Sequence, residues 1–387
     1  MGSQRSFWVW DMAVMPPGFK QIQATCRAVG PESYVFVDDS VPVSDEAIAT
    51  VDRRLHREGS TGSVDPRRGF AAINNDYFGA PALGQDNDRK AYVLITELAP
   101  FNGMVMDGYV NAFDSLTEEE AWREYGQHSN QAEVVYLNHA SKPVDSDYML
   151  GVLAHEYQHL CHQAADPDEE SWVNEMVAEA AMSVNGYHTD MGHVARYASK
   201  SDHPPLVSQT YVSYGACMLF GTYLQERYGK GFFQALVANP DNGTAGIDST
   251  LQSFGRPERF DDLYKDWVVA NYADSRGVID PGLHYGTLDL PAMTEARSID
   301  EFPDLDSAEL AASSVRYLKL ALPEAGRVEI PEGLSVQLLS FEGGRMTRTE
   351  LTGPEAELPA GNDRVLVVAN PLSEKLSYTL RIWPAED

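Results

Sequence analysis

The sequence predicts an α+β protein: a mixed sheet with covering helices, then a mostly helical subdomain, then a small C-terminal β-sandwich. Three observations predict this fold. The first 140 or so residues contain short runs rich in β-branched and aromatic residues. From about residue 146 to 273, apolar residues recur at helical spacing. After about residue 290, short alternating segments are separated by Gly, Pro and Asn turns, which is typical of a sandwich.

The composition is that of a globular protein with excess negative charge. The chain has 387 residues, 43% of them hydrophobic, and 58 acidic against 29 basic residues give a net charge of −29. Nucleic acids and anionic membranes are polyanions, so we expect neither as the main partner. No run of about 18 apolar residues is present, so no membrane span is predicted. The first residues lack the basic and apolar regions of a signal peptide.

The first part of the chain is expected to contain several strands and one helix. The helix covers residues 44–56, where Ser44 is a good cap and acids follow it. Residues 70–90 are interpreted as polar turns that lead into a strand. Strands are expected at 7–14, 33–38, 91–98 and 133–139.

The middle of the chain is expected to be helical. A helix from about 146 to 165 ends at Asp166, because a residue before proline disfavours the α conformation. Asp166 or Ser171 can cap the next helix, which runs to about residue 184. Further helices are expected at 210–228, ending at a Gly229 cap, and at 230–238, 246–254 and 258–273.

Three segments follow from these elements. Residues 1–185 would form the N-terminal α/β part, 186–290 a helical subdomain and 305–387 the sandwich. The stretch 298–309 is interpreted as a linker before the sandwich.

The most informative motif is His155-Glu156-Tyr157-Gln158-His159, which matches H-E-x-x-H. Residues four apart on a helix lie on one face, so His155 and His159 can both bind one metal ion. Glu156 would lie beside that ion, where a carboxylate can take a proton from water.

A catalytic zinc site usually has a third protein ligand. The metzincin pattern would require a glycine and a third histidine, but those positions are His162 and Ala165. His162 lies on the same face but too far along the helix. Glu175 on the next helix is therefore the expected ligand, and Glu179, one turn later, the expected acceptor for a ligating histidine. The reverse assignment is the alternative.

H-E-x-x-H followed by "WVNE" resembles the gluzincin clan of zinc metallopeptidases, whose third ligand is a glutamate in an "NE" helix. The order of motifs over about residues 30–230 is similar to the hyicolysin-like secreted bacterial metallopeptidases. The resemblance implies a thermolysin-like zincin catalytic unit, one zinc ion per chain, peptide-bond hydrolysis and secretion. Met176 departs from the family, since many relatives have glycine there, and the spacer between His159 and Glu175 is shorter than in thermolysin.

Hydrolysis would also need a donor to the oxyanion, usually a tyrosine or histidine downstream of the metal ligands. Tyr214 is the first candidate and Tyr211 the second. His188, His193 and His203 are further candidates.

We therefore expect a zinc-dependent metalloendopeptidase acting on proteins or peptides. A G-x-M-E-N motif for N-terminal trimming is missing, and "GMVMD" at 103–107 is a poor match. The alternatives are a zinc aminopeptidase of the same clan, or a binding or adhesion protein with a non-catalytic metal site. Glu156 argues against the last, because a structural site needs no base. The C-terminal sandwich is a candidate for binding another macromolecule.

Other residues have simpler interpretations. Gln158 and His162 are expected to face solvent or support the ligands. Asp86 and Asp88 either bind Ca²⁺ or, more simply, cap a turn. Cys161 is expected to be buried, with Cys217 as a possible disulfide partner. The segment 108–113 is the candidate edge strand for binding an extended substrate.

Overall fold

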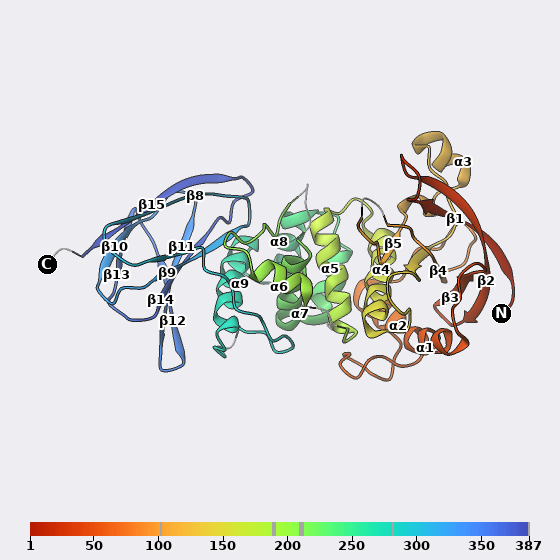
Figure 1. The fold of residues 1–387 in the computed structure, drawn as a ribbon, viewed down its shortest axis with the longest axis horizontal. Helices are drawn as coiled ribbons and strands as arrows, with labels where there is room; N and C mark the ends of the chain where they lie inside the picture. Colours follow the sequence, from red (N-terminus) through yellow and green to blue (C-terminus); the bar gives the residue numbers. More distant parts are fainter. Residues whose placement is uncertain (101–102, 188–190, 209–212, 281, 386–387) are drawn as a thin grey trace. The chain divides into compact units, whose positions relative to one another are not determined.

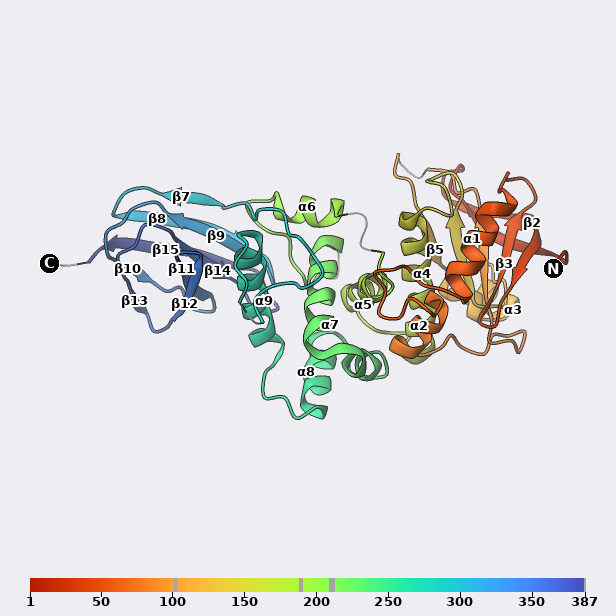
Figure 2. The same ribbon diagram turned by 90° about the horizontal axis from the view of Figure 1, so that it is seen from below.

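The computed structural model describes residues 1–100, 103–187, 191–208, 213–280 and 282–385. Its architecture is mixed α/β with a β-rich C-terminal part, which confirms the coarse prediction (Figures 1 and 2). The chain forms two compact units. Unit 1 comprises Met1–Glu169, Val177–Asp190 and Lys230–Pro240, and unit 2 comprises Glu170–Met176, Met191–Gly229 and Asp241–Asp387.

These units do not follow the three predicted segments, because helices between 191 and 275 share unit 2 with the sandwich. The domain boundaries at 185, 290 and 305 stay a prediction.

Unit 1 contains a six-stranded sheet of order β1-β2-β3-β4-β6-β5 (Figure 1). Its middle strands β3, β4 and β6 are parallel, whereas β1, β2 and β5 pair antiparallel with their neighbours. All five residues of β6 are buried, as expected for a parallel strand covered on both faces. The strands are β1 (Gln4–Asp11), β2 (Gly18–Val29), β3 (Ser33–Asp38), β4 (Ala91–Thr96), β5 (Gly108–Val110) and β6 (Val134–Asn138).

Strand β2 is absent from the sequence prediction. Its inward positions in the second half hold the small residues Ala24, Cys26 and Ala28, all buried. Small residues give a weak alternation of hydrophobicity, so the usual signal of a half-buried strand is faint.

Helices α1, α2 and α4 pack side by side in unit 1, and α1 and α4 contact the sheet (Figures 1 and 2). The Ser44 hydroxyl accepts a hydrogen bond from Ala47 N at 3.1 Å, so the predicted cap of α1 is formed. The bounds are α1 (Asp45–His56), α2 (Phe70–Phe78), α3 (Glu118–Glu120) and α4 (Asp147–Ala165), with a 3₁₀ turn η1 (Ala112–Ser115) and a π turn η2 (Ala121–Tyr125).

The prediction of polar turns from residue 70 is wrong for its first part, because Phe70–Phe78 is helix α2. Its Asn74 is fully buried, and Asn74 Nδ2 donates to the carbonyl of Ala154 in α4 at 2.7 Å. Asn74 Oδ1 accepts from Asn185 Nδ2, also at 2.7 Å. An asparagine that suggests a turn in the sequence therefore serves here as a buried link between helices.

Helix α4 ends where predicted. It begins after Ser146, whose hydroxyl accepts from Met149 N, and it stops at Asp166 before Pro167. Helix α5 (Ser171–Val184) follows after a short turn. The division into units passes through this helix, with Ser171–Met176 counted in unit 2 and the rest in unit 1.

Unit 2 contains the helices α6 (Gly192–Ala198), α8 (Gly243–Ser253), α9 (Phe260–Ser275) and the first part of α7 (Tyr214–Val237). Helix α6 was not predicted. At Gly229 the backbone of α7 has φ 64°, so the chain leaves the helical conformation at the predicted cap and a second helical segment starts. Among the described helices, none is both long and apolar enough to cross a membrane.

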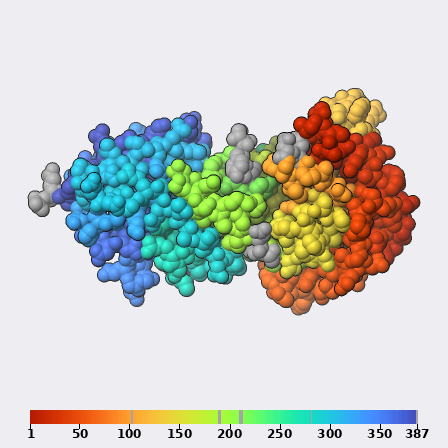
Figure 3. All heavy atoms as spheres, viewed as in Figure 1, coloured from red at the N-terminus to blue at the C-terminus, as the bar shows by residue number. Residues whose placement is uncertain are grey.

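The C-terminal part of unit 2 is two antiparallel-rich sheets of orders β13-β10-β15-β8 and β12-β11-β14-β9-β7. Leucine and valine side chains from both sheets share one core, so the sheets pack as a sandwich, and its residues form one continuous body in Figure 3. The strands are β7 (Arg297–Ile299), β8 (Asp304–Leu310), β9 (Val315–Leu320), β10 (Gly326–Glu329), β11 (Ser335–Glu342), β12 (Arg345–Leu351), β13 (Glu355–Leu358), β14 (Arg364–Ala369) and β15 (Leu376–Pro384).

The predicted linker at 298–309 is wrong, because most of it belongs to strands β7 and β8. Strand β8 pairs with β15 along its whole length. Its inward-facing Asp306 is buried, where it accepts from Tyr378 Oη at 2.6 Å and pairs with Arg316 at 3.2 Å. A buried carboxylate at a core position hides the strand's alternation in the sequence.

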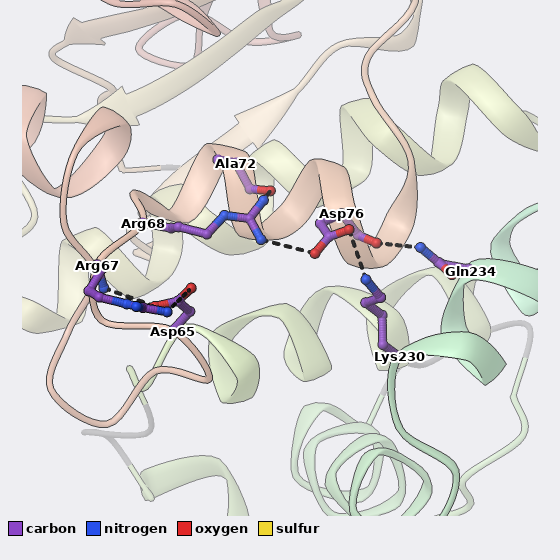
Figure 4. A network of polar contacts seen from close by, with 7 residues as sticks. All are labelled: Asp65, Arg67, Arg68, Ala72, Asp76, Lys230 and Gln234. Atoms are coloured by element: carbon purple, nitrogen blue, oxygen red, sulfur yellow. Dashed lines mark hydrogen bonds and ion pairs between the residues drawn. The ribbon is translucent and has the colours of Figure 1, made fainter.

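Helix α2 is tied to residues Lys230–Pro240 by Asp76 (Figure 4). Its carboxylate accepts from Lys230 Nζ at 2.9 Å and from Arg68 Nη1 at 3.0 Å. Its backbone carbonyl accepts from Gln234 Nε2 at 2.6 Å. These contacts hold the segment Lys230–Pro240 against α2 within unit 1.

This network generates a prediction about pH. The hydrogen bond from Lys230, and then that from Arg68, holds the pKa of Asp76 below its usual value. The unfolded state therefore binds a proton first as pH falls, so the stabilisation is present above about pH 4 and is lost below it. We expect Asp76→Asn to lower the free energy of unfolding by about 1 kcal/mol at pH 7. The difference from the wild type should shrink by pH 3, as measured by urea unfolding.

Asp65→Asn is the control, because Asp65 pairs with Arg67 within one exposed turn (Figure 4). We expect Asp65→Asn to lower the free energy of unfolding by less than Asp76→Asn does. If Asp76→Asn lowered the free energy of unfolding equally at pH 3 and pH 7, the stabilising role of the ionised Asp76 carboxylate would be wrong.

Candidate metal centre

The H-E-x-x-H motif lies in the second half of helix α4. The rings of His155 and His159 face each other edge to face, with centroids 4.8 Å apart and an interplanar angle of 86°. Their spacing of one helical turn puts both on one face of α4. His155 is buried and His159 half-buried, so these rings line a polar position that is partly shielded from solvent.

Helix α5 brings a carboxylate to these histidines. One ligand atom from each of His155, His159 and Glu175 lies within 4.8 Å of the other two. Tetrahedral ligands about 2.1 Å from one zinc ion would be about 3.4 Å apart. Rotamer changes that move each atom by about 1 Å are therefore enough to close the group around an ion. The donor set of two imidazoles and one carboxylate suits zinc.

Glu179 lies one turn further along α5 and close to the ring of His155. Its Oε1 is 3.6 Å from Nδ1 of His155, within ion-pair range although longer than a hydrogen bond. A carboxylate at Nδ1 favours the tautomer that leaves Nε2 free to bind a metal. The carboxylate of Glu179 thus lies near Nδ1 of His155, whereas Glu175 has an oxygen near ring nitrogens of both histidines, so the roles predicted for the two acids stay a prediction.

Glu156 stands between the histidines in sequence and is buried, with 8% of its surface exposed. Strand β5 passes directly over it. A Cβ atom built on Gly108 would lie 3.0 Å from Cγ of Glu156 and 2.9 Å from the carbonyl oxygen of Tyr136. Only glycine allows so close an approach, so Gly108 lets β5 border the carboxylate of Glu156.

Strand β5 is fixed by contacts with β6 along one edge, and its other edge is the end of the sheet. Tyr109 stacks on Tyr136 with ring centroids 4.1 Å apart, and Asn138 N donates to the carbonyl of Asp107 at 2.8 Å. Asp107 in turn accepts hydrogen bonds from Ser141 and Tyr148. Because β5 is the last strand in the order of the sheet, its second edge has no strand partner among the described residues.

The close approach at Gly108 generates a prediction. We expect Gly108→Ala to lower the free energy of unfolding by about 1–3 kcal/mol, because the new methyl group meets a backbone oxygen that cannot turn away. Urea unfolding measures this change. Gly18→Ala is the matched control, since its Cβ would meet its nearest atom at 3.7 Å. Equal stability for both variants would show that Gly108 does not lie this close to the carbonyl oxygen of Tyr136 in β6.

The interpretation of Gln158 and His162 as solvent-facing or surface groups is wrong. Both side chains are fully buried. Burial, with a smaller contribution from His159, lowers the pKa of His162 to about 3, so its ring is neutral at physiological pH. Gln158 and His162 are polar residues in a helix, and nothing in the local sequence indicates that their side chains face the protein interior.

The residues proposed as oxyanion donors belong to unit 2 where they are described. Tyr214 begins α7, is 37% exposed and lies beside the ring of His193, with centroids 5.3 Å apart. His193 Nδ1 is also 2.8 Å from Arg196. His203 is buried, with its ring nitrogens near the carbonyls of Tyr197 and Thr294, so it has a structural role. Tyr211 and His188 lie outside the described residues.

Asp86 and Asp88 serve a turn. Asp86 accepts from Tyr92 Oη at 2.8 Å and from Asp88 N, while Asp88 accepts from Tyr34 Oη at 2.7 Å. These contacts support the simpler interpretation of a capped turn, although they leave Ca²⁺ binding a prediction.

The suggested disulfide is not formed, because none of the buried residues Cys26, Cys161 and Cys217 is in a disulfide. Cys161 Sγ lies 3.4 Å from the carbonyl of Tyr157, one turn earlier in α4. Cys217 Sγ lies 3.6 Å from the carbonyl of Trp172. Both thiols therefore behave as small core residues.

Comparison with known proteins does not identify a family. No protein-family model matches the sequence, and no curated protein matches it. Among solved structures, a periplasmic inhibitor of g-type lysozyme from Salmonella Typhimurium is 17% identical, covers 23% of this chain and 97% of its own, and has a TM-score of 0.19. A 4-O-methyl-α-glucuronidase of family GH115 is 8% identical, covers 62% of this chain and 39% of its own, and has a TM-score of 0.14. Likenesses this weak carry no argument about function.

Proposed function

We propose that this protein is a zinc-dependent metalloendopeptidase with a thermolysin-like catalytic unit. The observation that carries the proposal is the grouping of His155, His159 and Glu175 from two successive helices. The chemistry of this set fits zinc, and Glu156 follows the first ligand directly in sequence. The carboxylate of Glu179 near Nδ1 of His155 supports the same assignment.

The residues would divide the work as follows. A zinc ion in such a site supplies Lewis acidity, which acidifies water and polarises a carbonyl group. Glu156 takes the proton of the attacking water and passes it to the leaving amine. Its partial burial under β5 keeps this carboxylate close to the reacting groups. Glu179 orients the ring of His155, and Tyr214 is the proposed donor to the oxyanion.

Strand β5 supports a mode of substrate binding. It is an edge strand, and Gly108 brings it against Glu156. An extended peptide can pair with such an edge through backbone hydrogen bonds, which select for extended chains rather than for one sequence. The scissile bond would then lie beside the base. This placement supports internal cleavage, because an edge strand holds residues on both sides of the bond.

Other parts of the proposal rest on the resemblance alone. Secretion and binding of a further macromolecule by the sandwich are expectations of that kind. The aminopeptidase alternative differs in one observable respect, since an aminopeptidase needs a free amino terminus. Cleavage of a peptide with an acetylated amino terminus at an internal bond would exclude it.

The direct test removes the base and keeps the ligands. We expect Glu156→Gln to lower kcat for casein or a peptide library by about 100-fold or more, because general-base catalysis contributes about 10²–10⁴-fold. Zinc content should stay at the wild-type value, as measured by mass spectrometry of the metal. Glu119→Gln is the control, because it removes an exposed carboxylate from α3.

Two outcomes would reject the proposal. Unchanged hydrolysis in Glu156→Gln would show that another group is the base. Zinc bound by the wild type without any hydrolysis would favour the binding or adhesion protein.

A further inference from the structure

A second group of possible metal ligands lies at the end of helix α4. One ligand atom from each of His162, Asp166 and Glu169 lies within 4.8 Å of the other two. His162 is in the last turn of α4, Asp166 is the residue that ends the helix, and Glu169 lies in the turn before α5. All three belong to unit 1, and none is a residue of the first group.

The histidine of this group is buried without a hydrogen-bond partner. His162 is 0% exposed, and neither Nδ1 nor Nε2 has a partner. Leaving a buried polar atom unpaired costs about 1–3 kcal/mol, so native proteins rarely tolerate it. The unpaired ring therefore indicates a missing ligand. One ring nitrogen lies within 4.8 Å of an oxygen of each of the two carboxylates, and a metal ion bound there would satisfy that nitrogen.

Two further buried groups strengthen this point. Asp166 is 4% exposed, and its Oδ2 has no hydrogen-bond partner. Gln158, one turn before His162 on the same helical face, is 0% exposed, and neither atom of its amide has a partner. His162 and Asp166 thus both leave buried polar atoms unpaired at the end of α4, where a bound cation with its water would supply the missing contacts, and Gln158 leaves its amide unpaired one turn earlier.

The donor set limits which cation fits. Ca²⁺ and Mg²⁺ prefer oxygen ligands, whereas an imidazole nitrogen with two carboxylates suits zinc and similar transition metals. Burial, and then a side-chain hydrogen bond with Asp168, raises the pKa of Asp166, and a bound cation would oppose both effects. The turn from Asp166 to Glu169 leads directly into α5.

We propose that His162, Asp166 and Glu169 form a second site for a divalent transition metal ion, with zinc as its natural occupant. This ion has a structural role: it ties the last turn of α4 to the turn that precedes α5. It binds independently of the first group and stabilises unit 1 whether or not the protein is a peptidase.

The test uses the full chain and counts zinc. We expect calorimetric titration to find two zinc ions per wild-type chain and one in the double variant His155→Asn, His159→Asn, in which the first group is removed. Adding Glu169→Gln to that variant should weaken the remaining zinc affinity at least tenfold. At a fixed zinc concentration it should also reduce the zinc-dependent rise in Tm, because the amide of Gln binds a metal ion more weakly than the carboxylate of Glu169.

Asp147→Asn is the matched control, since it removes an exposed carboxylate from the other end of α4 and should leave zinc binding unchanged. If the double variant fails to fold, Glu169→Gln in the otherwise wild-type chain decides the question, with one zinc ion expected instead of two. Absence of zinc binding in the double variant, or equal zinc affinity with and without Glu169→Gln in that variant, would overturn the proposal. So would a Ca²⁺ response stronger than the zinc response. The activity of Glu156→Gln bears only on the first group, so the two proposals fail separately.

Discussion

The break between α4 and α5 is the constraint on which the candidate centre depends. Pro167 cannot continue the helix, and Asp166 ends it. Without this break, α4 would run on, and the carboxylates of α5 could not return to the histidines. With it, Glu175 joins His155 and His159, and Glu179 reaches Nδ1 of His155. The same turn holds Asp166 and Glu169, so one local feature of the sequence organises both groups of ligands.

Several polar side chains are buried around α4, and the free-energy cost of removing them from water has to be offset by hydrogen bonds. Asn74 links α2, α4 and the end of α5 through hydrogen bonds to Ala154 and from Asn185. A buried amide is stabilising only when its bonds are made, so these contacts also fix where α4 lies. Gly108 then lets β5 close over Glu156. Rigid placement of this kind is what a catalytic carboxylate needs, because small misplacements lower rates strongly.

Much of this arrangement could be predicted from local sequence. The Ser44 and Ser146 caps, the stop at Asp166 and the change at Gly229 each follow from the chemistry of one or two residues. The spacing of His155 and His159 likewise needs only a helix.

The failures have a common cause, which is polar residues at buried positions. Strand β8 looked like a linker because Asp306 faces the core, and α2 looked like a turn because Asn74 is buried between helices. His162 looked like a surface residue for the same reason. In each case the partner is distant in sequence or is a ligand, so hydrophobic periodicity could not reveal it.

The central claim is that His155, His159 and Glu175 hold one zinc ion. The most direct measurement is anomalous diffraction at the zinc absorption edge from crystals of the protein loaded with one equivalent of zinc. We expect the strongest peak about 2.0–2.2 Å from a ring nitrogen of each histidine and from an oxygen of Glu175. A fully occupied zinc ion elsewhere, or one bound by the two histidines with Glu175 turned away, would contradict the claim.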